Sequence, residues 1–141
     1  MTTPPENPPE PRDLALIALY EADQRRLPHA ELDADYPAKA ARLVRGVEDH
    51  LAELGSAIDG VSTRWRVARM PPVDRAILRL GLYELRFEKR TPIGVILAEA
   101  VRLARTYSTE RSSAFVNGIL SQLATRERPE EVQTGPKPVS P

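Results

Sequence analysis

The 141-residue sequence predicts an all-α protein of six or seven helices. Apolar residues recur three or four positions apart over long segments, which is the period of an amphipathic helix. Several internal prolines stand where such a segment begins, a position that the fixed φ of proline favours. Alternating strand patterns are absent, and the Asn117-Gly118 pair, which could form a hairpin turn, falls inside a helical pattern.

Two helical segments are expected in the first half of the chain, over residues 12–26 and from residue 37 to about residue 58. The acidic stretch 31–35 and the proline before it predict a loop between them, and Pro37 suits the first position of the second segment. Gly55 marks a break that would divide this second segment into two helices. The apolar faces are formed by Leu14, Ile17, Ala18, Leu43, Val44, Val47, Leu51, Leu54 and Ile58.

Three further helices are expected in the second half, beginning near Pro72, Pro92 and Thr109. Thr91 precedes Pro92 as an N-cap, and Thr109 or the serine before it can cap the last helix. A turn or two before Pro72 carries Trp65, the only tryptophan, which we interpret as a core residue. The helix that begins near Pro72 is expected to bury a combination of Ile77, Leu80, Tyr83 or Glu84, and Phe87. In the two helices that follow, the residues expected to face inward are Ile96, Ala100, Leu103, Ala104, Tyr107, Phe115, Val116, Ile119, Leu120 and Leu123.

Both ends of the chain are expected to lie outside the folded domain. Nine of the 14 prolines fall in residues 1–11 and 129–141, together with Thr, Ser and Glu and few apolar residues. Such segments bury too little apolar surface to offset the entropy that is lost on ordering. The sequence therefore predicts one helical domain over residues 12–128 between two disordered tails.

The composition excludes several classes of function. Without cysteine, disulfides, thiolate chemistry and cysteine-based zinc sites are excluded, and His29 and His50 stand alone, so we expect no metal. Neither a glycine-rich phosphate loop nor a nucleophile motif occurs, so we expect no cofactor and no enzyme activity. No apolar run approaches the ~20 residues of a membrane span, and the N-terminus does not resemble a signal peptide. We therefore expect a cytoplasmic protein without a membrane partner.

The formal net charge is zero, but the charge is unevenly distributed. Residues 64–128 contain thirteen basic and six acidic side chains, a balance of +7. Arginine supplies 17 of the 20 basic residues, and its guanidinium group forms bidentate contacts with phosphates and stacks on planar groups. This asymmetry favours a nucleic-acid surface on the C-terminal half. The alternative is a GC-rich genome that encodes Arg in place of Lys.

Several motifs occur in a characteristic order along the chain. They are Ala18-Leu19-Tyr20, Val73-Asp74-Arg75-Ala76-Ile77-Leu78-Arg79 with Leu82-Tyr83-Glu84-Leu85, the segment 92–100, and Phe115-Val116-Asn117-Gly118-Ile119-Leu120. Each motif alone has little specificity. In this order and spacing, residues 12–126 resemble the NusB family of bacterial transcription antitermination factors.

The resemblance implies both a fold and a function. The family fold is two small helical bundles packed together, with the first helix crossing between them. NusB proteins bind the boxA sequence of nascent ribosomal RNA leaders as single-stranded RNA, together with NusE, which is also a small-subunit ribosomal protein. The pair helps to convert RNA polymerase into a termination-resistant antitermination complex. The implied function is therefore binding and assembly, without chemistry.

The resemblance also implies which residues bind. RNA contact is expected from Arg12, Arg75, Arg79, Arg111, Phe115 and Asn117, and NusE contact from Asp74, Tyr83 and Glu84. Family members usually begin with an arginine-rich segment, but residues 7–12 read Asn-Pro-Pro-Glu-Pro-Arg here, so that only Arg12 is retained. Arg111 in turn stands where the family tends to have an acidic residue. We therefore expect RNA contact to shift from the N-terminus toward Arg75, Arg79, Arg111 and Phe115.

Each assignment has a structural alternative. Phe115 could stack on an unpaired base or belong to the core. Arg75 and Arg79, one helical turn apart, could grip adjacent phosphates or form a solvated charged face, and Asp74 could meet NusE or interact with the dipole of its own helix. For the whole protein, the alternative is a NusB-fold interaction module that has lost RNA binding. The sequence also leaves open whether the chain forms a homodimer.

Overall fold

The computed structural model describes residues 10–134, and within them it contains seven α-helices and one 3-10 turn but no strand. The prediction of an all-α fold is therefore confirmed. The elements are α1 (Pro11–Gln24), α2 (Ala38–Asp49), α3 (Leu51–Val61), the 3-10 turn η1 (Val67–Arg69), α4 (Pro72–Phe87), α5 (Ile93–Tyr107), α6 (Glu110–Glu127) and α7 (Pro129–Thr134). Among these residues, no helix combines the length and the apolar character that crossing a bilayer requires.

The helical segment expected from residue 37 is divided at His50 rather than at Gly55. His50, with φ −121° and ψ 20°, ends α2 and begins α3. Gly55 is buried inside α3 and does not interrupt it. The change of direction at His50 lets both α2 and α3 contact α4.

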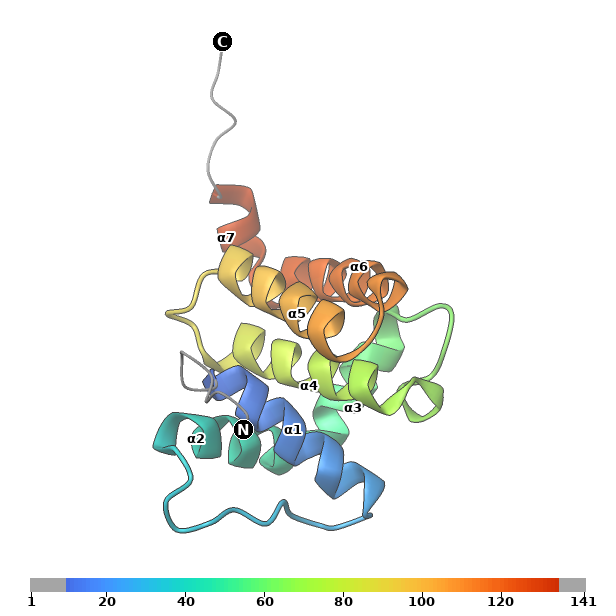
Figure 1. The fold of residues 1–141 in the computed structure, drawn as a ribbon. Coiled ribbons are helices and arrows are strands. Elements are labelled where there is room, and N and C mark those ends of the chain that lie inside the picture. Colours follow the sequence, from blue (N-terminus) through green and yellow to red (C-terminus); the bar gives the residue numbers. More distant parts are fainter. Residues whose placement is uncertain (1–9, 135–141) are drawn as a thin grey trace.

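α4 lies at the centre of the molecule, between two layers of helices (Figure 1). α1 and α2 lie on one side of it and α5 and α6 on the other, while α3 contacts both α4 and α6. Ten of the 16 residues of α4 are buried, as is typical of a helix that is enclosed by its neighbours. The expected pair of packed bundles is present, but α4 rather than α1 is the helix that they share.

Close packing on α4 depends on two glycines at helix contacts. Gly81 of α4 faces Leu120 of α6, and a Cβ on Gly81 would lie 2.8 Å from a methyl group of Leu120. Gly46 of α2 lies against the ring of Tyr83 on another side of α4, where a Cβ would overlap the ring. A side chain at either position would push the neighbouring helix away, and overpacking of this kind typically costs about 1–3 kcal/mol.

The chain beyond residue 128 continues as α7, although the sequence predicts a tail there. Arg128 is buried, and its guanidinium donates hydrogen bonds of 2.6–3.0 Å to the backbone carbonyls of Glu84, Leu85, Glu88 and Thr91. Carbonyls at the end of a helix lack partners within it, so Arg128 acts as a cap on α4. In α7, Glu131 accepts the backbone N–H of Ile93 at the start of α5, at 2.8 Å. The folded domain therefore extends to about residue 134, and residues 1–9 and 135–141, also predicted to be disordered, lie outside the described residues.

Candidate nucleic-acid interface

The two arginines of α4 that the sequence predicts as phosphate contacts face another helix. Nε of Arg75 donates to Oδ2 of Asp23 on α1 at 2.7 Å, and Nη1 of Arg79 lies 3.9 Å from the same oxygen. Their side chains are only 16% and 17% exposed. They do lie one turn apart on one face of α4, as their spacing predicts, but this face packs on α1. Both side chains are engaged inside the fold. Their assignment as direct RNA contacts stays a prediction.

Arg12 also has an internal partner. Its Nε and Nη2 donate to the carboxylate of Glu84 at 2.7–3.0 Å, and this bidentate pair joins α1 to α4. Burial opposes the charged form of Arg12, but the hydrogen bonds to Glu84 outweigh it, so the pKa of Arg12 lies above its ordinary value. Glu84 is 4% exposed. The pair holds α1 on α4. The assignments of Arg12 as an RNA contact and of Glu84 as a NusE contact stay predictions.

Asp74 and Tyr83, the other predicted NusE contacts, are 1% and 8% exposed. The two carboxylate oxygens of Asp74 accept hydrogen bonds from the hydroxyls of Ser108 and Ser112, each at 2.8 Å. These bonds join the first turn of α4 to the turn between α5 and α6. Tyr83 packs on Gly46 of α2. Both residues connect helices in the fold, and their assignment as NusE contacts stays a prediction.

A pair of aromatic rings, one exposed and one partly buried, lies beside the contact of Asp74 with Ser108 and Ser112. Trp65, in the chain between α3 and α4, is 43% exposed, and its ring meets that of Phe115 on α6 edge to face, with centroids 5.5 Å apart. Both rings line a cleft of about 550 Å³ between residues 64–71 and the start of α6. Phe115 is partly buried and also packs against the core. Trp65 is therefore not the core residue that the sequence predicts, whereas Phe115 belongs to both the core and the surface.

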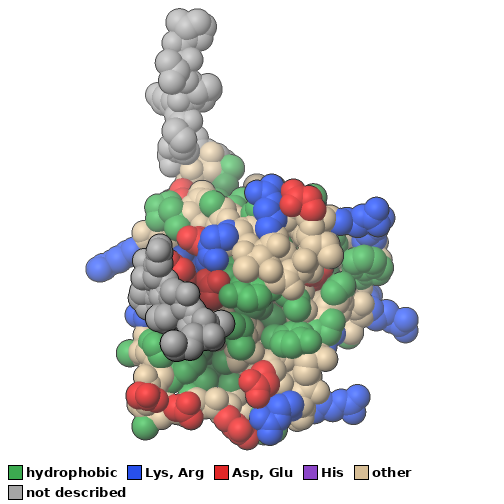
Figure 2. Space-filling model, viewed as in Figure 1, with side chains coloured by type: hydrophobic (Ala, Val, Ile, Leu, Met, Phe, Trp, Pro, Cys, Tyr) green, Lys and Arg blue, Asp and Glu red, His purple; other side chains and the backbone are tan. Residues whose placement is uncertain are grey.

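Four exposed arginines accompany the aromatic pair. Arg64 and Arg111 line the cleft, and Arg66 and Arg69 follow on the same segment as Trp65. The guanidinium carbon of Arg64 lies 5.7 Å from the centroid of the Trp65 ring, within the range of a cation–π interaction. None of the four forms an ion pair within the part of the chain that the structure describes. Figure 2 shows basic side chains projecting along the side of the molecule on which α3 connects to α4.

The segment that carries Trp65 is fixed by hydrogen bonds. The hydroxyl of Ser62 donates to the carbonyl of Trp65 at 2.5 Å, and the carboxylate of Asp59 accepts the N–H of Val67 at 2.6 Å. Nη1 of Arg75 donates to two carbonyl groups in and just after η1, at 3.2 and 3.3 Å. Arg75 therefore holds the segment that carries Trp65 in place through these backbone carbonyls. Its own side chain does not line the aromatic cleft.

Asn117, the remaining predicted RNA contact, is exposed on α6 but lies two residues after Phe115. Two residues correspond to about 200° around a helix, so Asn117 points away from the aromatic pair. Arg111 precedes Phe115 by four residues and lies on the same face of α6. The structure therefore brings Arg111 and Phe115 together and leaves Asn117 outside their cleft.

Sequence reasoning missed Trp65 and Arg64 as candidate binding residues. Trp65 follows Val61 by four positions, which suggests one continuous apolar stripe, but α3 ends at Val61. A local signal was present, because Trp65 lies directly between Arg64 and Arg66 and after two hydroxyl residues. Polar residues clustered between two helical segments are typical of an exposed loop.

The chain matches the model of the NusB family over residues 9–125. A protein of Acidothermus cellulolyticus named transcription antitermination protein NusB is 43% identical over 138 residues, which covers 92% of this chain and 94% of that relative. The similarity in sequence therefore extends over nearly the full length of both chains.

Two solved structures share the fold. One is NusB of Thermotoga maritima, with a TM-score of 0.77, 35% sequence identity, and coverage of 88% of this chain and 94% of that chain. The other comes from the crystal structure of the antitermination factors NusB and NusE in complex with double-stranded RNA, with a TM-score of 0.67, 27% identity, and coverage of 82% of this chain and 94% of that chain. The arrangement of helices described above is therefore shared with both.

Proposed function

The chain belongs to the NusB family of transcription antitermination proteins, and we propose that it binds boxA-like single-stranded RNA of nascent ribosomal RNA leaders together with NusE. In this proposal, the assembly makes RNA polymerase resistant to termination during ribosomal RNA transcription. The solved relative in complex with NusE and double-stranded RNA supports RNA and NusE as partners. The role of the protein is recognition and assembly.

The observation that carries the RNA-binding proposal is the exposed Trp65–Phe115 pair with Arg64 and Arg111 beside it. Aromatic rings at a cleft can stack on unpaired bases, which contributes about 1–3 kcal/mol per base. Guanidinium groups without an internal carboxylate partner are available for phosphates. Because stacking requires bases that are splayed out of a duplex, this chemistry favours single-stranded RNA.

The proposed set of RNA-binding residues differs from the one that the sequence predicts. Arg111 and Phe115 are retained, and Arg64 and Trp65 join them at the cleft. Asn117 remains a proposed contact at the outer side of α6, for a nucleotide beyond the cleft. We propose that NusE contacts exposed side chains rather than the buried residues that the sequence predicts.

The single tryptophan provides a direct test. Titration with single-stranded boxA RNA is expected to quench the fluorescence of Trp65, and a scrambled RNA and a boxA duplex are expected to bind more weakly. NusE is expected to raise the affinity for boxA RNA. Equal affinity for boxA and scrambled RNA, with and without NusE, would refute boxA recognition. RNA binding that leaves the Trp65 emission unchanged would refute stacking at the cleft.

One observation favours the second candidate, a NusB-fold interaction module that has lost RNA binding. Arg12 is the only retained arginine of the N-terminal family segment, and it is occupied by Glu84. In this case NusE would be captured in a pulldown while boxA RNA fails to bind under the same conditions. Sedimentation of the free protein in the same buffer tests the homodimer that the sequence leaves open.

A further inference from the structure

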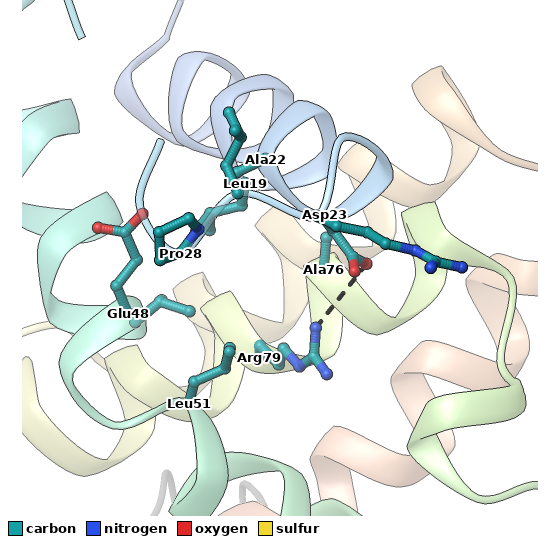
Figure 3. A pocket seen from close by; sticks show the side chains of 11 residues that line it. Leu19, Ala22, Asp23, Pro28, Glu48, Leu51, Ala76 and Arg79 are labelled. Atoms are coloured by element: carbon teal, nitrogen blue, oxygen red, sulfur yellow. Dashed lines mark ion pairs between the residues drawn. The ribbon is translucent and has the colours of Figure 1, made fainter. Parts of the chain in front are cut away.

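A second pocket lies between the end of α1, the junction of α2 and α3, and α4 (Figure 3). Its volume is about 340 Å³, at the lower end of the range of about 300–1,000 Å³ that is typical of small-molecule sites. No residue that lines it also lines the aromatic cleft. Most of its wall is apolar and includes Leu19, Ala22, Leu27, Val47 and Leu51.

The two carboxylates that line this pocket are engaged by residues outside it. Oδ2 of Asp23 accepts Nε of Arg75 at 2.7 Å. Oε1 of Glu48 accepts Nη1 of Arg45 at 2.7 Å, and Oε2 accepts the backbone N–H of Ala30 at 2.5 Å. The shortest contacts of both carboxylates are therefore with groups that do not line the pocket.

The two arginines that line the pocket have no comparable partner. Nη1 of Arg79 lies 3.9 Å from Asp23, and its Nε is buried without a hydrogen-bond partner. Burial lowers the pKa of Arg79, because Asp23 compensates for the lost hydration only in part. Arg26 forms no ion pair with any described residue. It also has a positive φ of 55°, a left-handed backbone conformation that is uncommon for residues other than Gly and Asn.

We propose that this pocket binds a small organic carboxylate, whose acid group pairs with Arg79 and Arg26 and whose apolar part lies against the leucines. A carboxylate accepts two parallel hydrogen bonds from one guanidinium group, a geometry that Arg79 does not have with Asp23. The apolar wall disfavours a strongly hydrated ion such as inorganic phosphate, because buried charge without full pairing is costly.

A ligand in this position contacts α1, the α2–α3 junction and α4 at once. It stabilises the packing of these helices by mass action, since the unfolded chain does not contain the pocket. The site shares no residue with the RNA cleft. The two proposals therefore succeed or fail independently of each other.

Octanoate is a suitable probe, with octylammonium and octan-1-ol as the matched cation and neutral molecule. Octanoate is expected to cause saturable shifts of the backbone amide signals of Leu19, Ala22 and Leu51 in ¹H–¹⁵N spectra of the full chain. The other two probes are expected to cause much smaller shifts. Equal shifts with all three probes would indicate apolar partitioning without recognition of the acid and would overturn the proposal, as would the absence of shifts with octanoate.

Two variants test the role of the guanidinium. Arg79→Met, which keeps the length of the side chain, is expected to weaken octanoate binding about tenfold or more, as is usual when a hydrogen bond to a charged group is lost. Leu51→Glu places a competing carboxylate at a rim position that is 44% exposed, so it is expected to abolish binding with little change in melting temperature. Arg69→Met, at an exposed arginine outside the pocket, is the control. Wild-type octanoate affinity in Leu51→Glu would overturn the proposal even if Arg79→Met does not fold.

Discussion

The arginines on the α1–α4 contact and the arginines at the aromatic cleft differ in what they face. Arg12 and Arg75 are less than one-fifth exposed and form ion pairs across the helix contact. Arg64 and Arg111 are exposed and have no carboxylate partner in the described chain. Arginine therefore has two roles in this domain: some arginines join helices through ion pairs, and others lie exposed at the cleft. Only the exposed arginines have a charge that is available to a ligand.

The difference is set by carboxylates that are remote in the sequence. Arg12 meets Glu84, which is 72 positions away, and Arg75 meets Asp23, which is 52 positions away. A local count of charge, such as the balance of +7 over residues 64–128, includes both kinds of arginine. It therefore overestimates the charge that a phosphate backbone would meet on this half of the molecule.

The largest effect is expected when an arginine of the helix contact is removed. Arg12→Ala leaves the buried carboxylate of Glu84 without its partner, and such a change typically costs roughly 3–5 kcal/mol of unfolding free energy. Urea denaturation measures this loss, and RNA affinity of the variant that is still folded should change little. Arg111→Ala is the matched control and should stay within about 0.5 kcal/mol of the wild type. Unchanged stability together with lost boxA affinity in Arg12→Ala would restore Arg12 as an RNA contact.

A smaller effect, confined to binding, is expected at the cleft. Trp65→Leu removes a stacking surface and should weaken boxA binding by about 1–3 kcal/mol, measured by fluorescence anisotropy of a labelled RNA. The salt dependence of binding should not change, because stacking releases no counterions. Phe87→Leu, at an aromatic residue that is 41% exposed on the far end of α4, serves as the control. A large drop in the melting temperature of Trp65→Leu with unchanged RNA affinity would show that Trp65 acts as a core residue.

The two groups of arginines should also differ in the salt dependence of RNA binding. Replacing Arg64 and Arg111 together by Gln should lower the slope of log affinity against log salt by about 1.4, since each phosphate contact with single-stranded RNA contributes about 0.7. Replacing Arg75 and Arg79 by Gln should reduce stability and leave this slope unchanged in the folded fraction. A lower slope in the second pair and not in the first would reverse the assignment of the two groups.

The smallest effect concerns acid stability at the contact between α1 and α5. Asp13 accepts hydrogen bonds from Arg102 at 2.7 and 3.1 Å and from Tyr107 at 2.8 Å. Burial raises the pKa of Asp13, but these bonds outweigh it, so its pKa lies below the ordinary value of 3.8. A carboxyl group whose pKa is lower in the folded state contributes stability above its unfolded pKa and loses it as the pH falls through the folded pKa.

Asp13→Asn should therefore reduce stability at neutral pH and flatten the loss of stability below about pH 4. Urea denaturation at a series of pH values measures this. Glu21→Gln, at an exposed carboxylate of the same helix, should follow the wild-type pH profile. An unchanged profile in Asp13→Asn would mean that the contact between Asp13 and α5 contributes nothing to acid stability.

Local patterns were sufficient to predict the helices. Apolar spacing and the prolines at positions 72 and 92 act within one or two turns, so the class and most boundaries follow from them. The exceptions depend on distant partners. α7 was not predicted, because Arg128 and Glu131 also contact the end of α4 and the start of α5, which are remote in the sequence.

The candidate site could be predicted only in part. Arg111 and Phe115 share a helix face, so their proximity follows from their spacing, and the structure confirms that both line one cleft. Trp65 joins them from a different segment, and its position depends on how the 62–71 chain returns to α4. Spacing along one helix carries no information about such a contact.

Composition and helical periodicity are properties of neighbouring residues, and from them follow an all-α chain and a surplus of arginine in its C-terminal half. Which arginines are paired inside the fold and which stay exposed depends on the packing of the helices, because an ion pair requires a carboxylate within a few ångströms in space. This packing also decided that Trp65 lies at the surface beside Phe115, where an aromatic ring is accessible to an unpaired base. The burial of a side chain and the identity of its ion-pair partner depend on which helices pack together. In this chain both follow from the position of α4 between its neighbouring helices.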